Sequence, residues 1–221
     1  GWWSDSMRAT TVVDYGIVNL RNILRGLEHV GAKVEVTHDP ERLLKADRVI
    51  LPGVGAFAAG MAELGSRDLD QALIEIAAVG RPVLGICLGM QMLLETSTEN
   101  GRHQGLGLIP GDVIPIPKEG DNTSERRRKV PHIGWNALDY PSHMTTWRNT
   151  CLNATSQGAF FYFVHSFMAA LESTTYVLAQ CNYEDLPIVA AIAKDNITGL
   201  QFHPERSGPE GLQILKTFVS G

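Results

Sequence analysis

The stretch PVLGICLGMQMLLE (residues 82–95) places a cysteine between two glycines, where an apolar strand-like run becomes a helix-like one. A cysteine without a role usually lies among apolar neighbours within one element. Cys87 instead occupies a sharp junction, in a G-x-Cys-x-G pattern that has the shape of a nucleophile elbow. The first amides of the following helix would face the sulfur and favour its thiolate form. The stretch therefore predicts a strand–turn–helix unit with a reactive thiol at its turn.

Strand and helix signals alternate through the first half of the chain. We expect strands at 10–14, 33–37, 48–57 and 81–86, the third of which runs into a glycine-rich turn. We expect helices at 17–31, at 40–46 and from that glycine-rich turn to about Val79. This alternation indicates βαβ units and a parallel sheet. Ligands of such sheets bind beyond the carboxyl ends of the strands. Both PGVG (52–55) and GICLG (85–89) are expected at these ends.

The second half consists of short strand-like pieces with few helical stretches, which predicts an antiparallel extension of the sheet. The last segment, 208–220, is a helix whose predicted buried side is Leu212, Leu215 and Phe218. We expect a single mixed α/β domain over residues 7–221, with a mostly parallel central sheet flanked by helices in a flavodoxin-like arrangement. Residues 1–6 are interpreted as an expression remnant or a natural extension.

Composition excludes several classes of function. A net charge of −5 argues against nucleic-acid binding, and the basic run RRRK (126–129) is interpreted as a solvated loop. No apolar run is long enough to span a membrane. Three widely spaced cysteines fit a reducing cytoplasm better than a disulfide framework. No His/Cys cluster has zinc-ligand spacing, so we expect no metal and no cofactor.

A base for the thiol is found near the end of the chain. His203 follows a strand-like run and opens the sequence HPE, and alternate residues of an extended segment lie on one side, so Glu205 is placed to hydrogen-bond its ring. Acyl chemistry also needs donors for an oxyanion. The Leu88 amide, directly after the nucleophile, is one candidate, and amides of the PGVG turn are others. Alone, each of these patterns also fits an inert cysteine, a surface histidine or a plain turn.

Six fragments, taken together, resemble class I glutamine amidotransferases of the triad type, and closely the glutaminase subunits of imidazole glycerol phosphate synthase. In chain order they are LPGVGAF, GICLGMQ, HQGLGLIPG, VPHIGWN, FYFVHSF and GLQFHPERS, and the resemblance covers residues 8–219. Two features depart from the family pattern. Arg206 follows HPE where lysine is common, and the charged segment 118–129 is longer than expected and has no assigned role.

The resemblance implies a role for each matching residue. It makes Cys87 the nucleophile, His203 the acid and base, and Glu205 the carboxylate that orients His203. The other implied positions are the oxyanion turn and amides (Gly53, Val54, Gly55, Leu88), contacts to glutamine (Gln91, Glu99, His165, Ser166, Phe167) and the edge facing a partner (Trp135, Asn136, Arg206). Cys151 and Cys181 are expected to have no role, and Tyr162 and Phe163 to be strand core.

The implied activity is hydrolysis of glutamine to glutamate and ammonia through a cysteine thioester. The implied partner is a (β/α)₈-barrel synthase subunit that consumes the ammonia to make imidazole glycerol phosphate and AICAR in histidine biosynthesis. Three alternatives stay open on the residues. They are an amidotransferase of the same subfamily that feeds another synthase, such as one for surface-sugar amination, a stand-alone γ-glutamyl thiol hydrolase, and a catalytically inactive interaction subunit.

Overall fold

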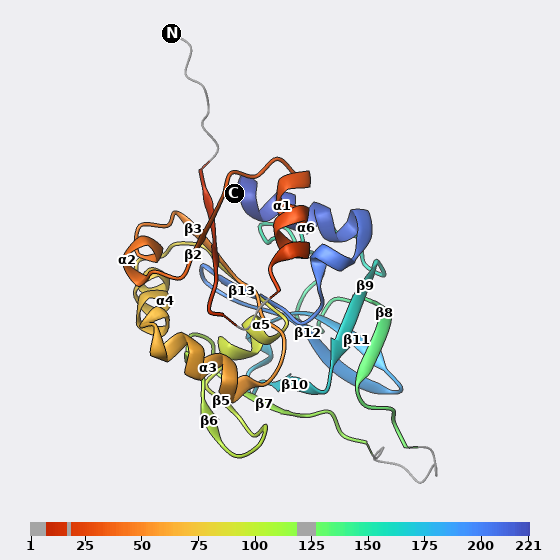
Figure 1. The fold of residues 1–221 in the computed structure, drawn as a ribbon. Coiled ribbons are helices and arrows are strands. Elements are labelled where there is room, and N and C mark those ends of the chain that lie inside the picture. Colours follow the sequence, from red (N-terminus) through yellow and green to blue (C-terminus); the bar gives the residue numbers. More distant parts are fainter. Residues whose placement is uncertain (1–7, 17–18, 119–126) are drawn as a thin grey trace.

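A seven-stranded sheet forms the centre of the computed structural model, which describes residues 8–16, 19–118 and 127–221. The strand order is β11-β12-β13-β4-β3-β1-β2 (Figure 1). The five parallel strands are β1 (Thr10–Val13), β2 (Val34–Thr37), β3 (Arg48–Leu51), β4 (Val83–Ile86) and β13 (Ile197–Leu200), and the two antiparallel ones are β11 (Val177–Tyr183) and β12 (Leu186–Lys194). The parallel part has the 2-1-3-4-5 order of a flavodoxin-like sheet, so the predicted fold class is confirmed.

Helices cover both faces of this sheet. On one face lie α1 (Arg21–His29) and α6 (Gly208–Ser220), and on the other α2 (Pro40–Leu43), α3 (Phe57–Ser66), α4 (Leu69–Ala78) and α5 (Leu88–Met92) (Figure 1). Adjacent strand residues point to opposite faces. Val12 therefore packs with α1 and α6, whereas Val13 packs with α3 and α4. Burial on both faces explains the continuous apolar runs of β1, β3 and β4.

Helices form where the sequence signals predict them, but some of their bounds and buried faces differ from the prediction. The helix expected over 17–31 begins at Arg21, and the helical region before Val79 is two helices, which are separated where Asp68 adopts a φ of 55°. In α6, Leu215 is fully buried as expected, but Leu212 and Phe218 are only partly buried.

Only part of the second half extends the central sheet. A separate four-stranded sheet, in the order β10-β7-β5-β6, contains β5 (Thr96–Ser97), β6 (His103–Gln104), β7 (Asp112–Pro115) and β10 (Phe167–Ala170). The strands β8 (His132–Ala137) and β9 (Phe160–His165) form a two-stranded antiparallel ribbon. The prediction of one antiparallel extension therefore holds for β11 and β12 but is wrong for β7, β8, β9 and β10, whereas the short strands β5 and β6 were not predicted. Apolar and polar residues alternate along a strand in the same way whichever sheet the strand joins, so this pattern does not indicate which strands pair.

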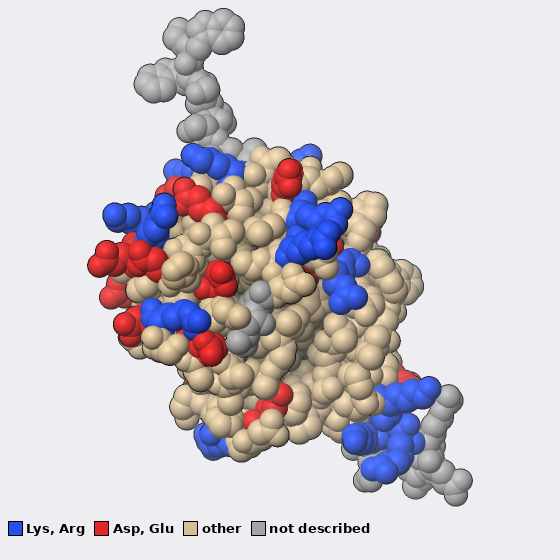
Figure 2. All heavy atoms as spheres, in the orientation of Figure 1, with Lys and Arg blue, Asp and Glu red and all other residues tan. Residues whose placement is uncertain are grey.

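Acidic and basic side chains share the surface seen in Figure 2, with one basic group at its lower right. The run RRRK was expected to be solvated, but the Arg128 side chain is buried and donates to the carbonyl oxygens of Pro117 and Glu184. The rest of the unassigned segment, 119–126, lies outside the described residues, as do residues 1–6. Among the described residues, no helix combines the length and apolar character needed to cross a bilayer.

Candidate active site

Cys87 lies at the carboxyl end of β4, between that strand and α5, in the predicted elbow. Its backbone adopts φ 55° and ψ −112°, and its N–H donates to the Leu200 carbonyl at 2.7 Å. The flanking glycines are required by close backbone approach. A Cβ on Gly89 would lie 1.9 Å from the Leu51 carbonyl oxygen, and one on Gly85 would lie 2.6 Å from the Gly89 oxygen. The elbow therefore accepts no residue larger than glycine at positions 85 and 89.

The Cys87 thiol opens onto a cavity of about 380 Å³, a volume typical of small-molecule sites. The cavity is lined by Val54, Gly55, Cys87, Leu88, Gln91, Glu99, Pro131, Val164, His165, Ser166, Phe167 and His203. All of these except Pro131 and Val164 were predicted as site residues from the sequence. The structure thus brings together segments that are up to 149 residues apart in the chain, counting from Val54 to His203.

His203 and Glu205 form a buried pair at the start of the short helix η2 (Pro204–Arg206). The His203 Nδ1 atom lies 2.6 Å from a Glu205 carboxylate oxygen. Burial alone would lower the pKa of His203, but the neighbouring Cys87 and Glu205 outweigh it and raise this pKa to about 10. The second ring nitrogen, Nε2, is buried and has no hydrogen-bond partner among the described residues. The geometry leaves Nε2 free to exchange a proton with a group bound in the cavity.

The amides of the candidate oxyanion turn are not available to an oxyanion in this structure. The Leu88 N–H donates to the Gly53 carbonyl oxygen at 3.2 Å, so it is already occupied. Because the Gly53–Val54 peptide bond is trans, the Val54 N–H points away from Leu88, opposite to that carbonyl. The preceding carbonyl, of Pro52, accepts a 2.7 Å bond from the buried Tyr15 hydroxyl. In this conformation the Leu88 N–H is therefore occupied, and the Val54 N–H is directed away from the position of an oxyanion.

Two polar side chains, Gln91 and Glu99, also line the cavity. The Gln91 amide nitrogen donates to the Phe167 carbonyl at 3.2 Å and to the Gln201 side-chain oxygen at 3.1 Å. Both of its hydrogens are thereby used, which leaves the Gln91 Oε1 atom to accept from a ligand. Glu99 accepts a 3.3 Å bond from the Phe57 N–H at the start of α3. An acceptor oxygen and a carboxylate that line the same cavity suit a cationic ammonium group.

Sequence reasoning missed two buried polar residues beside the site. Gln201 is fully buried, and its amide nitrogen lies 3.9 Å from the Cys87 sulfur. Its position two residues before His203 was a usable signal, since alternate strand residues share a side. His132 is also buried and lies 2.9 Å from His165, nitrogen to nitrogen. That contact depends on the pairing of β8 with β9, which the local sequence does not encode.

The residues predicted to face a partner, Trp135, Asn136 and Arg206, do not all lie on one face. Trp135 is 55% exposed, but the neighbouring Asn136 points to the opposite side of β8, where its amide donates to the Asn182 carbonyl at 2.7 Å. Asn136 therefore does not share the exposed face of Trp135, and a role for either residue at a partner interface stays a prediction. The Arg206 guanidinium lies over the Tyr162 ring, 4.3 Å from its centroid. Tyr162 is only partly buried, so its prediction as strand core is also corrected.

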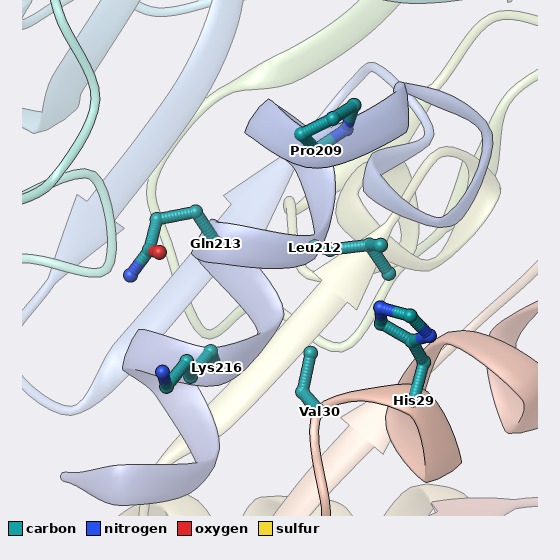
Figure 3. Close-up of a pocket in the computed structure, with 6 residues that line it drawn as sticks. All are labelled: His29, Val30, Pro209, Leu212, Gln213 and Lys216. Carbon is teal, nitrogen blue, oxygen red and sulfur yellow. The ribbon is translucent and has the colours of Figure 1, made fainter.

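A second hollow, of about 350 Å³, lies between α1 and α6 (Figure 3). Its lining residues are His29, Val30, Pro209, Leu212, Gln213 and Lys216. This set contains neither a thiol nor a carboxylate, so it cannot form a cysteine–histidine–carboxylate arrangement like that at Cys87. Within the described ranges, no group of three or more His, Cys, Asp or Glu side chains has an arrangement that could hold a metal ion. The candidate chemistry therefore belongs to the Cys87 cavity.

Comparison with known proteins agrees with this geometry. Residues 11–220 match the family model of class I glutamine amidotransferases. The chain is 42% identical over 213 residues to imidazole glycerol phosphate synthase subunit HisH 1 of Legionella pneumophila strain Lens, covering 96% of this chain and 99% of that protein. It is 42% identical over 207 residues to subunit HisH of Wolinella succinogenes, covering 94% of this chain and 97% of that protein.

Solved structures show the same fold at low sequence identity. A crystal structure of a glutamine amidotransferase superposes with a TM-score of 0.70 at 15% identity, covering 96% of this chain and 98% of the other. PurLQS from Thermotoga maritima superposes with a TM-score of 0.70 at 19% identity, covering 96% and 97%. With its Cys-centred elbow, its matching family model and its close relatives, the chain belongs to the class I glutamine amidotransferases, a family of enzymes, and within it to the relatives of HisH.

Proposed function

We propose that this protein hydrolyses glutamine to glutamate and ammonia as the glutaminase subunit of imidazole glycerol phosphate synthase. One observation carries the proposal. A cysteine at a strained elbow shares a glutamine-sized cavity with a histidine whose other nitrogen is bonded to a buried carboxylate. This is the arrangement that nucleophilic acyl chemistry needs. The names of the HisH relatives support histidine biosynthesis over surface-sugar amination as the pathway.

In the proposed first step, the Cys87 thiolate attacks the side-chain amide carbon of glutamine. The tetrahedral intermediate collapses as the C–N bond breaks, and the His203 Nε2–H gives its proton to the departing ammonia. In the second step, neutral His203 takes a proton from water, whose oxygen attacks the γ-glutamyl thioester. The C–S bond then breaks, which releases glutamate and restores the thiolate and imidazolium. Glu205 supports the charged ring in both resting and final states.

Glutamine would lie with its amide at the sulfur and its amino-acid end at the far side of the cavity. There the free Oε1 atom of Gln91 and the carboxylate of Glu99 are placed to receive the α-ammonium group. Backbone groups of the segment His165–Phe167, which line the same wall, are placed to hold the α-carboxylate. This orientation supports the predicted roles of all five substrate-binding residues.

The occupied Leu88 amide supports control by a partner. Rotation of the Gly53–Val54 peptide would break the bond between the Leu88 N–H and the Gly53 oxygen and turn the Val54 N–H toward the sulfur. Two oxyanion donors would then become available at once. A resting state that withholds both donors avoids wasting glutamine when no acceptor for ammonia is bound. A stand-alone thiol hydrolase has no use for such a state.

The outer face of the β8–β9 ribbon is the proposed docking surface for the synthase subunit. Ile133, Trp135 and Phe160 on this face are 59%, 55% and 58% exposed, and Val54 of the oxyanion turn is 46% exposed. Large apolar side chains gathered on a surface mark protein interaction sites. We propose a heterodimer with a (β/α)₈-barrel lyase subunit, located in the cytoplasm, where the three free cysteines would stay reduced. Arg206, over the Tyr162 ring, would border the same interface.

The decisive experiment measures glutamate and ammonia production by the isolated chain, by its complex with the barrel subunit, and by the complex with its nucleotide ligand. We expect weak activity from the isolated chain and stimulation of at least about 100-fold in the liganded complex, the equivalent of one oxyanion donor. Matched measurements on the Cys87→Ala complex give the background. Full activity of the isolated chain would revive the stand-alone hydrolase, and no activity in any sample would reject the glutaminase assignment.

A further inference from the structure

A chain of hydrogen bonds runs from the β8–β9 ribbon to the cavity wall through two buried histidines. The Asn136 amide nitrogen lies 3.4 Å from His132 Nε2, His132 Nδ1 lies 2.9 Å from His165 Nε2, and His165 Nδ1 lies 2.8 Å from the Phe167 carbonyl oxygen. The same carbonyl accepts the bond from the Gln91 amide at 3.2 Å. Asn136, His132 and His165 are here named the relay.

The chemistry of its two ends fixes every proton in the relay. A carbonyl oxygen only accepts, so His165 must carry its hydrogen on Nδ1. Neutral His165 then presents a bare Nε2, so His132 must donate from its own Nδ1. The bare Nε2 of His132 in turn accepts from the Asn136 amide. The direction of donation therefore runs without interruption from Asn136 to the Phe167 carbonyl.

Both rings are held in the neutral form that this direction requires. Burial lowers the pKa of His132 to about 4. Burial likewise lowers the pKa of His165 to about 4, with the charges of His132 and His203 acting in the same direction and the bond to the Phe167 carbonyl opposing them. Each ring consequently has one donor and one acceptor at neutral pH, and each of these four ring nitrogens has a partner.

We propose that this relay positions the glutamine-binding wall, and that His132 is a positioning residue for glutamine although it does not line the cavity. The inference rests on the proposed glutaminase function. His132 fixes the tautomer of His165, and His165 aims the Phe167 carbonyl. That carbonyl, together with Gln201, holds the Gln91 amide with its free oxygen toward the substrate. With the opposite His165 tautomer, two acceptor atoms would face each other and Gln91 would lose its fixed orientation.

A structural alternative for His132 is aromatic packing alone. Its ring lies between Phe163 and Tyr183, at centroid distances of 4.9 and 4.2 Å and interplanar angles of 24° and 30°. Two variants of His132 distinguish positioning by hydrogen bonding from aromatic packing. His132→Phe keeps an aromatic ring but removes the donor to His165. His132→Asn removes the ring but keeps an amide donor near the position of Nδ1.

The first test compares the KM for glutamine of both variants in the complex with the barrel subunit. We expect His132→Phe to raise KM by about 10-fold with a much smaller change in kcat, because an unpaired buried acceptor loosens binding of the substrate end. His132→Asn should remain close to wild type. A KM at least about fivefold higher for the Phe variant than for the Asn variant supports positioning. A smaller ratio, or the reverse order, overturns it. Thermal melts confirm that both variants are folded.

The second test reads the tautomers directly and needs no activity. Nitrogen-15 chemical shifts of the histidine side chains in the isolated wild-type chain, assigned with the His132→Phe variant, should show protonated Nδ1 and bare Nε2 on both His132 and His165. A protonated Nε2 on His165 overturns the relay. If wild type hydrolysed no glutamine, the proposed function would fall, whereas these shifts would still decide whether the relay exists.

Discussion

Replacing Val54 by proline is the sharpest test of the amide switch at the oxyanion turn. Proline has no N–H, so Val54→Pro deletes one proposed donor and leaves the Leu88 amide in place. Val54→Ala is the matched control, because it keeps the N–H and removes the same partly exposed side chain. Both variants are compared as isolated chains and as complexes with the barrel subunit and its nucleotide ligand.

The size of the effect follows from the number of donors. Loss of one oxyanion donor lowers kcat by about 100- to 1000-fold, or about 2.7–4 kcal/mol of barrier. Freeing the Leu88 N–H from the Gly53 oxygen, where it lies at 3.2 Å, costs roughly 1 kcal/mol, which is less than either donor supplies. The stimulated rate of the Val54→Pro complex should therefore fall by about 100-fold or more relative to Val54→Ala.

Steady-state glutamate production at saturating glutamine gives the comparison, and circular dichroism with a binding assay confirms folding and complex formation. The isolated Val54→Pro chain should differ little from the isolated Val54→Ala chain, since the Val54 N–H points away from the sulfur at rest. Equal stimulation of both complexes would refute the switch. A large loss in both variants would instead assign the effect to the side chain at the interface.

Three further predictions concern the triad. A glutamine-like diazo-ketone should alkylate Cys87 and spare Cys151 and Cys181, because burial raises the pKa of both of these thiols to about 12. Peptide mass spectrometry identifies the labelled cysteine. Labelling of Cys151 or Cys181 with loss of activity would reject Cys87 as the nucleophile. Cys87→Ala and His203→Ala should each abolish glutaminase activity, whereas Glu205→Gln should retain a measurable rate because an amide still orients the ring. Since the folded-state pKa of His203 is raised to about 10, its protonation stabilises the fold most below about pH 6.5, and this contribution is lost as the pH rises through about 10. Denaturant titrations should therefore find Glu205→Gln most destabilised near neutral and mildly acidic pH, and a deficit that stays constant up to high pH would contradict the charged pair.

Local features of the site could be predicted from the sequence because short-range geometry determines them. Glycines on both sides of Cys87 specify the elbow, since a Cβ at either position would strike backbone. The two-residue spacing of His203 and Glu205 specifies their contact. Alternating strands and helices indicate where the parallel strands end, and so bring the PGVG turn to the same edge.

Features that depend on pairing between distant strands could not be predicted. The bond between His132 and His165 exists because those two residues are opposite each other in the β8–β9 register. The inward direction of Asn136 follows from the same pairing. The burial of Arg128 is not visible in the sequence, because its carbonyl partners, Pro117 and Glu184, are brought to it only by the folded chain.

Side chains of β9 alternate between the proposed docking surface and the inner side of the ribbon, so a change in strand length would affect both surfaces at once. Phe160 and Tyr162 are exposed or partly exposed on the outer side, whereas Phe161, Phe163 and His165 are buried on the inner side. Insertion or deletion of one residue within this strand would exchange the two sets. A variant gaining a new docking surface in that way would simultaneously lose its substrate wall. Divergence of this ribbon toward other partners must therefore proceed by substitution at outward positions, with strand length held fixed.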